Sequence, residues 1–514
     1  MRHLRLAFSL FSLCIFTFTY PAQANEADIQ ALKKVFQDLL DYQKDVMAVY
    51  GDAMSLSYEG ELTITPQESY YAVKLPHMKF MAGPVGDQSV FDFGVITANA
   101  MRGDKEGTWK MALAFPPNYT FSGPEGSTVS ITLGQQNSVG ILSEKLGYFT
   151  NLDMTFGNVA VAVNGSSPDL PINISMGEIK FFQNLFSKDG ELYTGPINVS
   201  ANNLTFKPNE DGVFTLGEFA GNSTITDMDL PSLQEYKAKV MKHQETLAAM
   251  SDPASAEMAD PNAIIAMFAD LYDFKMDGFG IEYVVKNAAL QGAENQPDFK
   301  LASGKFGFNI EGLMKESGVF GIDFGYNGIE VQDEPPEYKD IVPRDTNLSI
   351  KANNIPIKAL TDLASTTMDS IAANPEMAQM AGLGVMMKVP MILSQAGTKF
   401  EFSDTYAKGN TYKTTLSGGG KADISAVMSM TADIKSIFAG LDDVLAIAEQ
   451  HQASPGEVGM YYMQLASTLN KLKSVGKATQ SAEGKPAYEF NFQITPEGTM
   501  TINGQDAQAL MMAP

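Results

Sequence analysis

Cysteine is nearly absent from this chain of 514 residues, which contains only one, Cys14. Cys14 lies in the apolar part of an export signal and is lost if that signal is removed. Without residues 1–24 the chain has no cysteine for a disulfide, a zinc–thiolate cluster or a thiol nucleophile. The preceding residues 11–13, Phe-Ser-Leu, lack the small residue expected before a lipidated cysteine, which argues against a lipoprotein.

Histidine and tryptophan are also scarce, with four and one in the sequence. His77, His243 and His451 lie far apart, and none has a neighbour at metal-ligand spacing. We expect His243 and His451 on the polar faces of helices, where a solvated histidine is the ordinary case. The single tryptophan, Trp109, gives little sign of the aromatic platforms on which sugars stack. We therefore predict no catalytic residue, no metal site and no cofactor.

Motifs for nucleophilic and phosphate chemistry are missing as well. No Gly-x-Ser-x-Gly elbow occurs. The glycine run in Ser417–Ala422 is superficially similar to a phosphate loop, but Thr415 stands where the first glycine belongs and Ala422 where the hydroxyl belongs. We interpret this run as a flexible bend after a strand. The 60 acidic residues always include some pairs, so an exported carboxylate-dependent hydrolase stays open as an alternative.

Basic residues are outnumbered, with 36 Lys and Arg against 60 Asp and Glu, for a net charge of −24. Such a chain is repelled by nucleic acid and by anionic lipid surfaces. Two arginines, the apolar run 6–20 and the small-x-small motif Ala22–Ala24 predict a signal peptide over residues 1–24. The mature chain then begins at Asn25; an uncleaved anchor is the alternative.

A period-two alternation of apolar and polar residues runs over most of the chain and predicts strands. The clearest strands are expected at 91–96, 108–115, 128–133, 153–163, 172–179, 197–206, 213–216, 274–285, 304–310, 319–324 and 347–352. Their alternate polar residues predict an extended antiparallel sheet with one wet face. The glycine–aromatic segments Phe306–Asn309 and Phe324–Asn327 look like two related hairpin arms.

Helical periodicity interrupts the strands at several places. A first helix with one buried face is expected over residues 26–50. Further helices are expected at 233–250, 262–272, 356–397, 434–450 and 457–475. Three helices follow a strand directly, near residues 231, 356 and 433, as expected for helices that cover the apolar face of a sheet. The predicted fold is α+β: an extended, curved antiparallel sheet, or two packed sheets, with several helices packed on it.

The length of the mature chain allows two or more cores. We predict a first part over residues 25–272, which holds the N-terminal helix, a long antiparallel sheet and a helical excursion. A second β-rich part covers residues 273–514 and carries helical excursions at about 356–397 and 434–475.

Methionine is abundant, with 29 residues, and five of them crowd into the excursion that leaves the sheet near residue 356. These five are Met377, Met380, Met386, Met387 and Met391. Methionine adapts to varied apolar shapes, so the five are candidates for an apolar groove that takes an acyl chain or a partner helix. The alternative is a helix that fills a core. Glycines, a lysine and a proline interrupt the stretch, which argues against a membrane span.

Short segments near both ends of the mature chain carry a family resemblance. They are Tyr58–Pro66 (YEGELTITP), Tyr70–Pro76 (YYAVKLP) and Gly498–Gly504 (GTMTING). This plan resembles the exported β-rich proteins of Gram-negative bacteria grouped as domain-of-unknown-function family 2125, and more loosely the AsmA-like and YdgA-like envelope proteins. For the AsmA-like proteins, the resemblance implies long sheets with an apolar groove and a role in envelope lipid homeostasis. It implies no catalytic residue.

The function expected from these features is that of a periplasmic, non-enzymatic protein of cell-envelope homeostasis. Its expected partner is an apolar ligand such as a lipid, or an envelope protein. Nucleic acid is not an expected partner, and no transmembrane span is expected after signal cleavage. A surface or adhesive protein is a further alternative, beside the hydrolase.

Overall fold

The computed structural model describes residues 25–48, 54–83, 89–123, 126–165, 172–208, 212–233, 235–236, 239, 243, 267, 275–292, 298–332, 334, 336–374 and 378–507. The chain divides into two compact units, Met1–Asn184 and Leu185–Pro514. The boundary predicted near residue 272 lies outside the described residues, as do the predicted signal peptide and nearly all of the helices predicted at 233–250 and 262–272. The fold is α+β and contains a large, open antiparallel sheet, as the alternation predicted.

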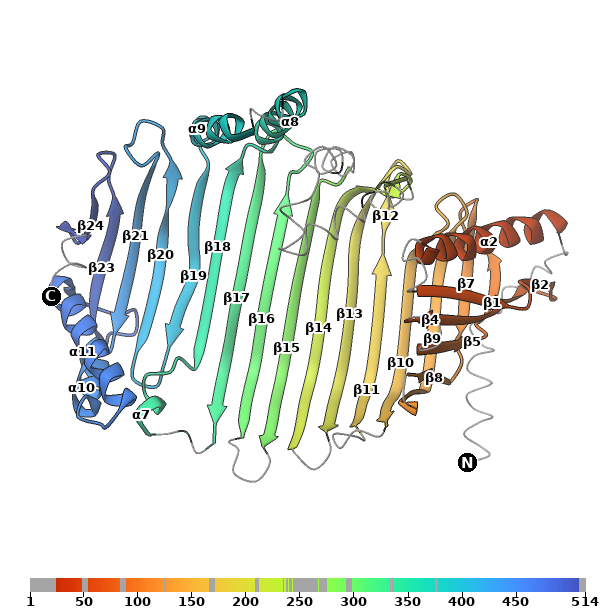
Figure 1. The fold of residues 1–514 in the computed structure, drawn as a ribbon, viewed down its shortest axis with the longest axis horizontal. Coiled ribbons are helices and arrows are strands. Elements are labelled where there is room, and N and C mark those ends of the chain that lie inside the picture. The colour runs from red at the N-terminus through yellow and green to blue at the C-terminus, as the bar shows by residue number, and fades with distance from the viewer. Residues whose placement is uncertain are drawn as a thin grey trace. The chain divides into compact units, whose positions relative to one another are not determined.

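The first unit opens with helix α2, Glu26–Ala48, which confirms the helix predicted there (Figure 1). Its strands are β1 Met54–Glu59, β2 Thr63–Pro66, β3 Tyr71–Lys74, β4 His77–Ala82, β5 Ser89–Gly94, β6 Thr97–Arg102, β7 Thr108–Ala114, β8 Asn118–Ser122, β9 Thr128–Ser143, β10 Tyr148–Asn164 and β11 Ile172–Asn184. Strand β9 is a branch point, because one edge pairs with β10 while the other pairs with β8 and then with β7. One branch continues through β5 and β4 to β1, and the other through β6 and β3 to β2.

The core of the first unit lies between α2 and the branch that contains β7. Leu32, Val35 and Phe36 form the apolar stripe of the helix, and they belong to one cluster with Tyr71 and Trp109 of the strands. Leu32 and Trp109 have no exposed surface. Each such side chain contributes about 1.5–3 kcal/mol by leaving water, so this stripe is what fixes the helix to the sheet.

The second unit is a long antiparallel meander (Figure 1). Its strands are β12 Phe186–Ser187, β13 Leu192–Pro208, β14 Gly212–Asp229, β15 Gly278–Gly292, β16 Phe299–Glu311, β17 Gly318–Val331, β18 Asp345–Ile355, β19 Lys399–Lys408, β20 Lys413–Ala422, β21 Met430–Ala439, β22 Lys477–Gln480, β23 Pro486–Ile494, β24 Met500–Ile502 and β25 Gln505–Asp506. From β13 to β21 each strand pairs with the next in the chain, and β21 then pairs with β23. Neighbours in sequence are therefore neighbours in the sheet.

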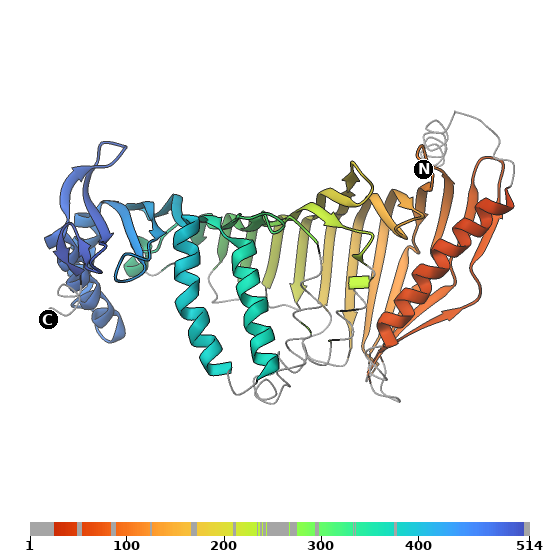
Figure 2. The ribbon, with the colours of Figure 1, turned by 90° about the horizontal axis from the view of Figure 1, so that it is seen from above.

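Helices leave this meander between strands. They are α7 Pro336–Lys339, α8 Ile357–Ala373, α9 Ala378–Ala396, α10 Leu441–His451 and α11 Glu457–Val475. Helices α8 and α9 confirm the excursion predicted at 356–397, and Figure 2 shows the two standing out from the sheet. We call them the α8–α9 arm.

The excursion predicted over 434–475 begins too early and is wrong in its first turn. Residues 434–439 belong to strand β21, and the helix starts only at Leu441, after Gly440 with a φ of 79°. Ile434 and Phe438 pair with strands on both sides, on β20 and β23. Cross-strand pairing thus overrides the apolar spacing that had suggested a helix, and the third strand-to-helix transition lies near residue 440 rather than 433.

Helices α10 and α11 cover one face of the sheet at its C-terminal end. Leu441 and Tyr462, almost completely buried, belong to a cluster that includes Phe490 of β23 and, partly buried, Phe438 of β21. The side chains of Phe438 and Phe490 therefore mark the face on which these helices pack.

A line of left-handed residues crosses the sheet of the second unit. Asn203 on β13, Asn287 on β15 and Gly328 on β17 have φ values of 55°, 52° and 65°. Pairing stays in register on both sides of them, so they lie on one line across the strands. On β13 the apolar residues are odd-numbered before this line and even-numbered after it. The alternation on β13 therefore skips one residue at this line without a shift of register. Asn and Gly tolerate the left-handed conformation best.

Candidate functional site

A row of paired residues runs across six strands, β13 to β18, of the second unit. We call it the apolar row: Val199, Gly221, Tyr283, Phe306, Phe324 and Leu348. Four of these side chains are large and exposed, Val199 and Tyr283 by 40% and Phe306 and Phe324 by 45%. Scattered exposed apolar residues are ordinary, but a contiguous line of them marks an interaction surface.

Two further rows lie on the same face, because residues two apart along a strand point the same way. The first contains Ile197, Ser223, Ile281, Phe308, Ile322 and Ile350, and the second contains Gly195, Ile225, Phe279, Ile310, Phe320 and Ala352. The rings of Phe308 and Phe320 meet edge to face, with centroids 5.3 Å apart. We call the three rows together the apolar face.

The opposite face of the same strands is polar. One row on it consists of Asn198, Asn222, Glu282, Gly307, Asp323 and Ser349. Nearby on that face, Lys286 Nζ of β15 lies 2.9 Å from Glu218 Oε2 of β14. The sheet therefore has the wet face that the alternation predicted, and the apolar face is its other side.

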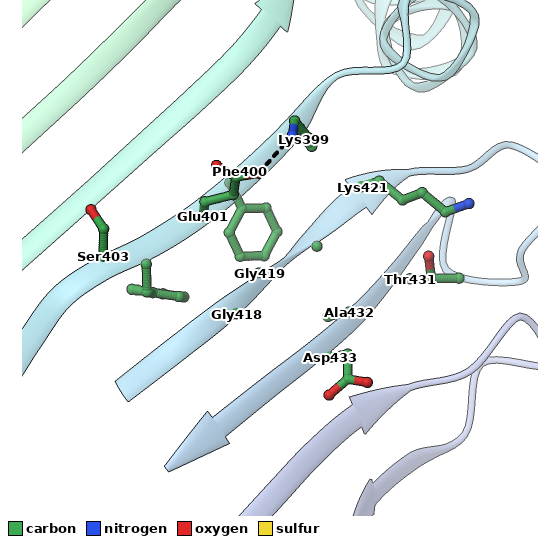
Figure 3. Close-up of a pocket in the computed structure, with 12 residues that line it drawn as sticks. Lys399, Phe400, Glu401, Ser403, Gly418, Gly419, Lys421, Thr431, Ala432 and Asp433 are labelled. Atoms are coloured by element: carbon green, nitrogen blue, oxygen red, sulfur yellow. Dashed lines mark hydrogen bonds and ion pairs between the residues drawn. The ribbon is translucent and has the colours of Figure 1, made fainter. Parts of the chain in front are cut away.

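The apolar face ends in a hollow of about 580 Å³ at β19, β20 and β21 (Figure 3). Phe400 and Phe402 line it beside the glycines 418–420, and its lining also includes four charged residues, Lys399, Glu401, Lys421 and Asp433. Phe402 pairs with Ile350, so the hollow adjoins the apolar face directly. A Cβ on Gly420 would lie 2.7 Å from the Phe400 ring, so this glycine makes room for the ring at the side of the hollow.

The flexible bend predicted at Ser417–Ala422 is wrong. These residues form the second half of β20 and pair with β19 on one side and β21 on the other. The glycines are in a strand because their neighbours approach too closely for side chains, as the Phe400 ring does at Gly420. From sequence alone a glycine run predicts a loop, because the contacts that require glycine in the strand come from other strands and are not visible in the sequence.

The α8–α9 arm starts on the side of the apolar face. A Cβ on Gly318, two residues before Phe320 on β17, would lie 2.9 Å from Ile357 of α8. Because residues two apart share a face, the arm's first residue sits over the apolar face. The arm therefore projects from the same side of the sheet that carries the apolar row.

The candidate methionines lie on this arm and face solvent. Met380, Met386, Met387 and Met391 of α9 are exposed by 58%, 74%, 73% and 41%, while Met377 lies outside the described residues. The four described side chains do not fill a core, which was the alternative to a binding role. They form an exposed apolar surface on a helix rather than the wall of an enclosed cavity.

Helix α9 is poor in charge over its whole length. Lys388 is its only charged residue among 19, and Leu383 is exposed by 59%. A helix that is apolar on all sides is ordinarily covered by other apolar material. Among the helices that the structure describes, none is long and apolar enough to cross a membrane. Helix α9 thus presents an apolar surface without being a span.

Residues for acid–base or metal chemistry are not gathered at this surface. No cluster of three His, Cys, Asp or Glu residues that could hold a metal ion occurs within the described ranges. His243 is 5% exposed, which corrects its predicted place on a polar helix face. The ring of His451 packs against Tyr462, with centroids 5.2 Å apart, and His77 Nε2 lies 2.6 Å from Asp92 Oδ1 in the first unit.

Sequence reasoning selected the methionines but did not select the apolar row. The signal was present in the two glycine–aromatic segments, which do form a hairpin, with Phe306 paired to Phe324. Alternation shows that these aromatic residues share a face, but it does not show whether another layer covers that face. Their 45% exposure is what makes them site residues.

Comparison with known proteins gives no relative: no family model, no curated protein and no solved structure matches this chain. The resemblance to the exported β-rich envelope proteins stays a prediction. The case for a function rests on the geometry described above.

Proposed function

We propose that this protein is a non-enzymatic protein of the periplasm that binds lipid acyl chains on its apolar face, in the service of cell-envelope homeostasis. The observation that carries the proposal is the apolar row, in which Phe306 and Phe324 are cross-strand partners and each is 45% exposed. Apolar surface left in water costs about 25 cal/mol per Å². A ligand that covers this row removes that cost.

The length of the apolar row suits an acyl chain. Its six strands have five gaps of about 4.8 Å, which together span roughly 24 Å. Half of a bilayer's hydrocarbon core, the depth that one acyl chain fills, is roughly 15 Å. Each methylene group that leaves water contributes about 0.8 kcal/mol, so contact along much of a chain is enough for stable binding.

The α8–α9 arm supplies a second apolar surface for the same ligand. It begins at Ile357, over the apolar face, and it carries the exposed residues Met386 and Met387. Methionine is unbranched and adapts to irregular apolar shapes, which suits acyl chains of varied length and saturation. The glycine-lined hollow beside Phe400 gives the end of a chain a place to enter.

The charge of the protein narrows the lipid class. A net charge of −24 repels anionic head groups at long range. The apolar face itself carries no charged side chain in its three rows. Zwitterionic and neutral lipids are therefore the expected ligands.

The direct test is to purify the protein from the periplasm without detergent, extract it with organic solvent and identify the lipids by mass spectrometry. The expected result is a reproducible set of acyl lipids that co-purifies with the protein in native mass spectra. Absence of bound lipid in repeated preparations would refute lipid binding. Recovery of an envelope protein crosslinked to the apolar face, without lipid, would replace the lipid by a protein partner.

A further inference from the structure

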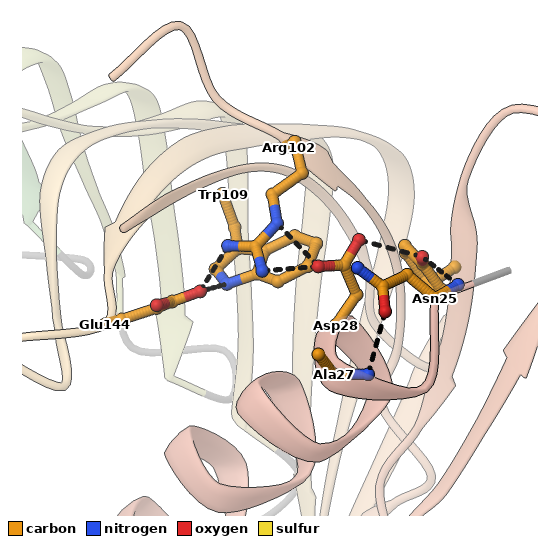
Figure 4. Close-up of polar contacts among 7 residues, drawn as sticks. Asn25, Ala27, Asp28, Arg102, Trp109 and Glu144 are labelled. Atoms are coloured by element: carbon orange, nitrogen blue, oxygen red, sulfur yellow. Dashed lines mark hydrogen bonds and ion pairs between the residues drawn. The ribbon is translucent and has the colours of Figure 1, made fainter. Parts of the chain in front are cut away.

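The backbone nitrogen of Asn25 lies in a polar cluster at the start of α2, in the first unit (Figure 4). It donates to the hydroxyl of Tyr71, with the two atoms 3.3 Å apart. The Asn25 side chain caps the helix, since its Oδ1 accepts a hydrogen bond from the backbone N–H of Ala27 at 3.1 Å. Asn25 is therefore held in place by both its side chain and its backbone.

Three charged side chains, those of Asp28, Arg102 and Glu144, complete the cluster together with Tyr71 and Trp109. Tyr71 of β3, which is 2% exposed, donates its hydroxyl proton to Asp28 Oδ2 at 2.9 Å. Arg102 of β6 donates from Nε to Asp28 Oδ1 at 2.9 Å and from Nη1 to Glu144 Oε1 at 2.5 Å. Its guanidinium lies 4.0 Å from the centre of the Trp109 ring, and Trp109 Nε1 donates to Glu144 Oε1 at 2.7 Å.

The charges of this cluster do not balance in the uncleaved chain. Asp28 and Glu144 carry two negative charges, and Arg102 carries one positive charge. The Asp28 side chain is only 13% exposed, so water screens the excess negative charge poorly. An amide nitrogen at Asn25 adds no charge, whereas an ammonium group at the same place would bring the sum to zero.

We propose that signal cleavage between Ala24 and Asn25 creates this missing cation, and that the new α-ammonium group of Asn25 completes the cluster and stabilises the first unit. A signal peptidase hydrolyses the peptide bond with one water molecule, leaving a carboxylate on Ala24 and an amino group on Asn25 that takes up a proton. Processing thus strengthens the fold as well as releasing the chain.

The groups that face the ammonium decide the sign of its effect. Asp28, which accepts from Tyr71, favours the charged form, and so does Glu144 from the far side of Arg102 (Figure 4). Arg102 and the positive end of the α2 dipole oppose it. Tyr71 accepts a hydrogen bond from the nitrogen. The Tyr71 hydroxyl links the nitrogen to the Asp28 carboxylate. We expect the attraction between the ammonium group and this carboxylate to prevail, so that the pKa of the amino group lies above its ordinary value of roughly 7.7–8.0.

The pH dependence follows from this direction. A folded-state pKa above the unfolded one gives stability that is fully present below about pH 7.7 and is lost as pH rises through the folded-state value. A chain that keeps two extra residues, Gln23 and Ala24, has its ammonium elsewhere. It is expected to lack this pH-dependent part of the stability while keeping the Asn25 helix cap.

The test uses the exported protein, whose intact mass first shows where the mature chain begins. Competitive acetylation across pH, with the N-terminal peptide quantified by mass spectrometry, then gives the pKa of the α-amino group. We expect a start at Asn25 and a pKa raised by about one unit, which is a tenfold shift in the proton equilibrium. In Asp28→Asn the pKa should return to the ordinary range, and in Asp38→Asn, an exposed position on the same helix, it should stay raised.

Three results would each overturn the proposal. The first is a mature chain that begins at another residue, and the second is an α-amino pKa in the ordinary range. The third is a raised pKa that Asp28→Asn leaves unchanged. Should Asp28→Asn fail to fold, Glu144→Gln removes a more exposed carboxylate of the cluster and must lower the pKa in the same direction.

Discussion

Phe306 of β16 and Phe324 of β17 are direct cross-strand partners, and neither is covered, since each remains 45% exposed. Paired aromatic side chains stabilise a sheet, but that role does not require them to face solvent. The pair lies in the middle of a row that crosses six strands. This relationship is the basis for assigning acyl-chain binding to the apolar face.

Substitution within the apolar row should weaken binding without unfolding the sheet. Phe306→Asp places a charge in the middle of the apolar face and should weaken binding of a fluorescent phosphatidylcholine probe, a zwitterionic lipid, about tenfold, or roughly 1.4 kcal/mol. The control is Asn327→Asp, an exposed position on the polar face of the neighbouring strand. Titration of the probe checks both variants, and equal affinity in the two would contradict the assignment of the ligand to the apolar face.

The methionines of α9 should matter for ligand retention and little for stability. Met386 and Met387 are exposed by 74% and 73%, and exposed substitutions ordinarily change the free energy of unfolding by no more than about 0.5 kcal/mol. The double variant Met386→Asp and Met387→Asp should therefore lose co-purified lipid but melt within a few degrees of the wild type. Ser365→Asp on α8 is the control. A large fall in melting temperature would show that the two methionines serve the core instead.

The stripe of α2 should be essential to the first unit. Leu32 has no exposed surface and belongs to the cluster around Trp109, so Leu32→Ala should lower the free energy of unfolding by about 2–5 kcal/mol. Lys33→Ala, at an exposed position next to it, should change that quantity by less than about 0.5 kcal/mol. Urea denaturation followed by circular dichroism measures both. Similar stability in the two variants would mean that α2 does not pack as described.

Alkaline pH should weaken the second unit through Tyr412. Burial raises the pKa of its hydroxyl to about 12, and the hydroxyl donates to the backbone oxygen of Ile341 at 3.0 Å. Because the folded-state pKa exceeds the ordinary value of about 10, its contribution to stability is present below pH 10 and is lost as pH rises toward 12. Burial also raises the pKa of Tyr58 to about 12, so tyrosinate absorbance should show a late step to which both tyrosines contribute. In Tyr412→Phe the amplitude of this step should fall by one tyrosine, and an unchanged amplitude would contradict the prediction for Tyr412.

Much of the fold could be predicted because local pattern and tertiary structure agree in it. The period-two alternation correctly predicted an antiparallel sheet, and the 3.6-residue period correctly predicted α2, α8, α9 and α11. The wrong predictions concern residues whose secondary structure is set by pairing with strands that are distant in sequence. Residues 434–439 have apolar spacing that suits a helix, yet pairing with β20 and β23 makes them a strand.

The candidate site was less predictable than the fold for a related reason. The composition of Met380–Met391 is a local property, and it identified the arm. Whether a face is covered depends on every other element of the unit, so no window of sequence could show that Phe306 and Phe324 stay exposed. The glycines 418–420 could not be predicted as part of a strand for the same reason, because the need for glycine there comes from close contacts with other strands, such as that of Phe400 with Gly420.

The measurement that tests the central claim most directly is the ratio of bound lipid to protein in periplasmic preparations of three forms. These are the wild type, the double variant Phe306→Asp and Phe324→Asp, and the polar-face control Asn327→Asp. We predict equal ratios in the wild type and the control, and a ratio near zero in the double variant, with similar circular dichroism spectra for all three. Lipid retained by the double variant at the wild-type ratio, or lipid absent from the wild type, would contradict the assignment of acyl-chain binding to the apolar face.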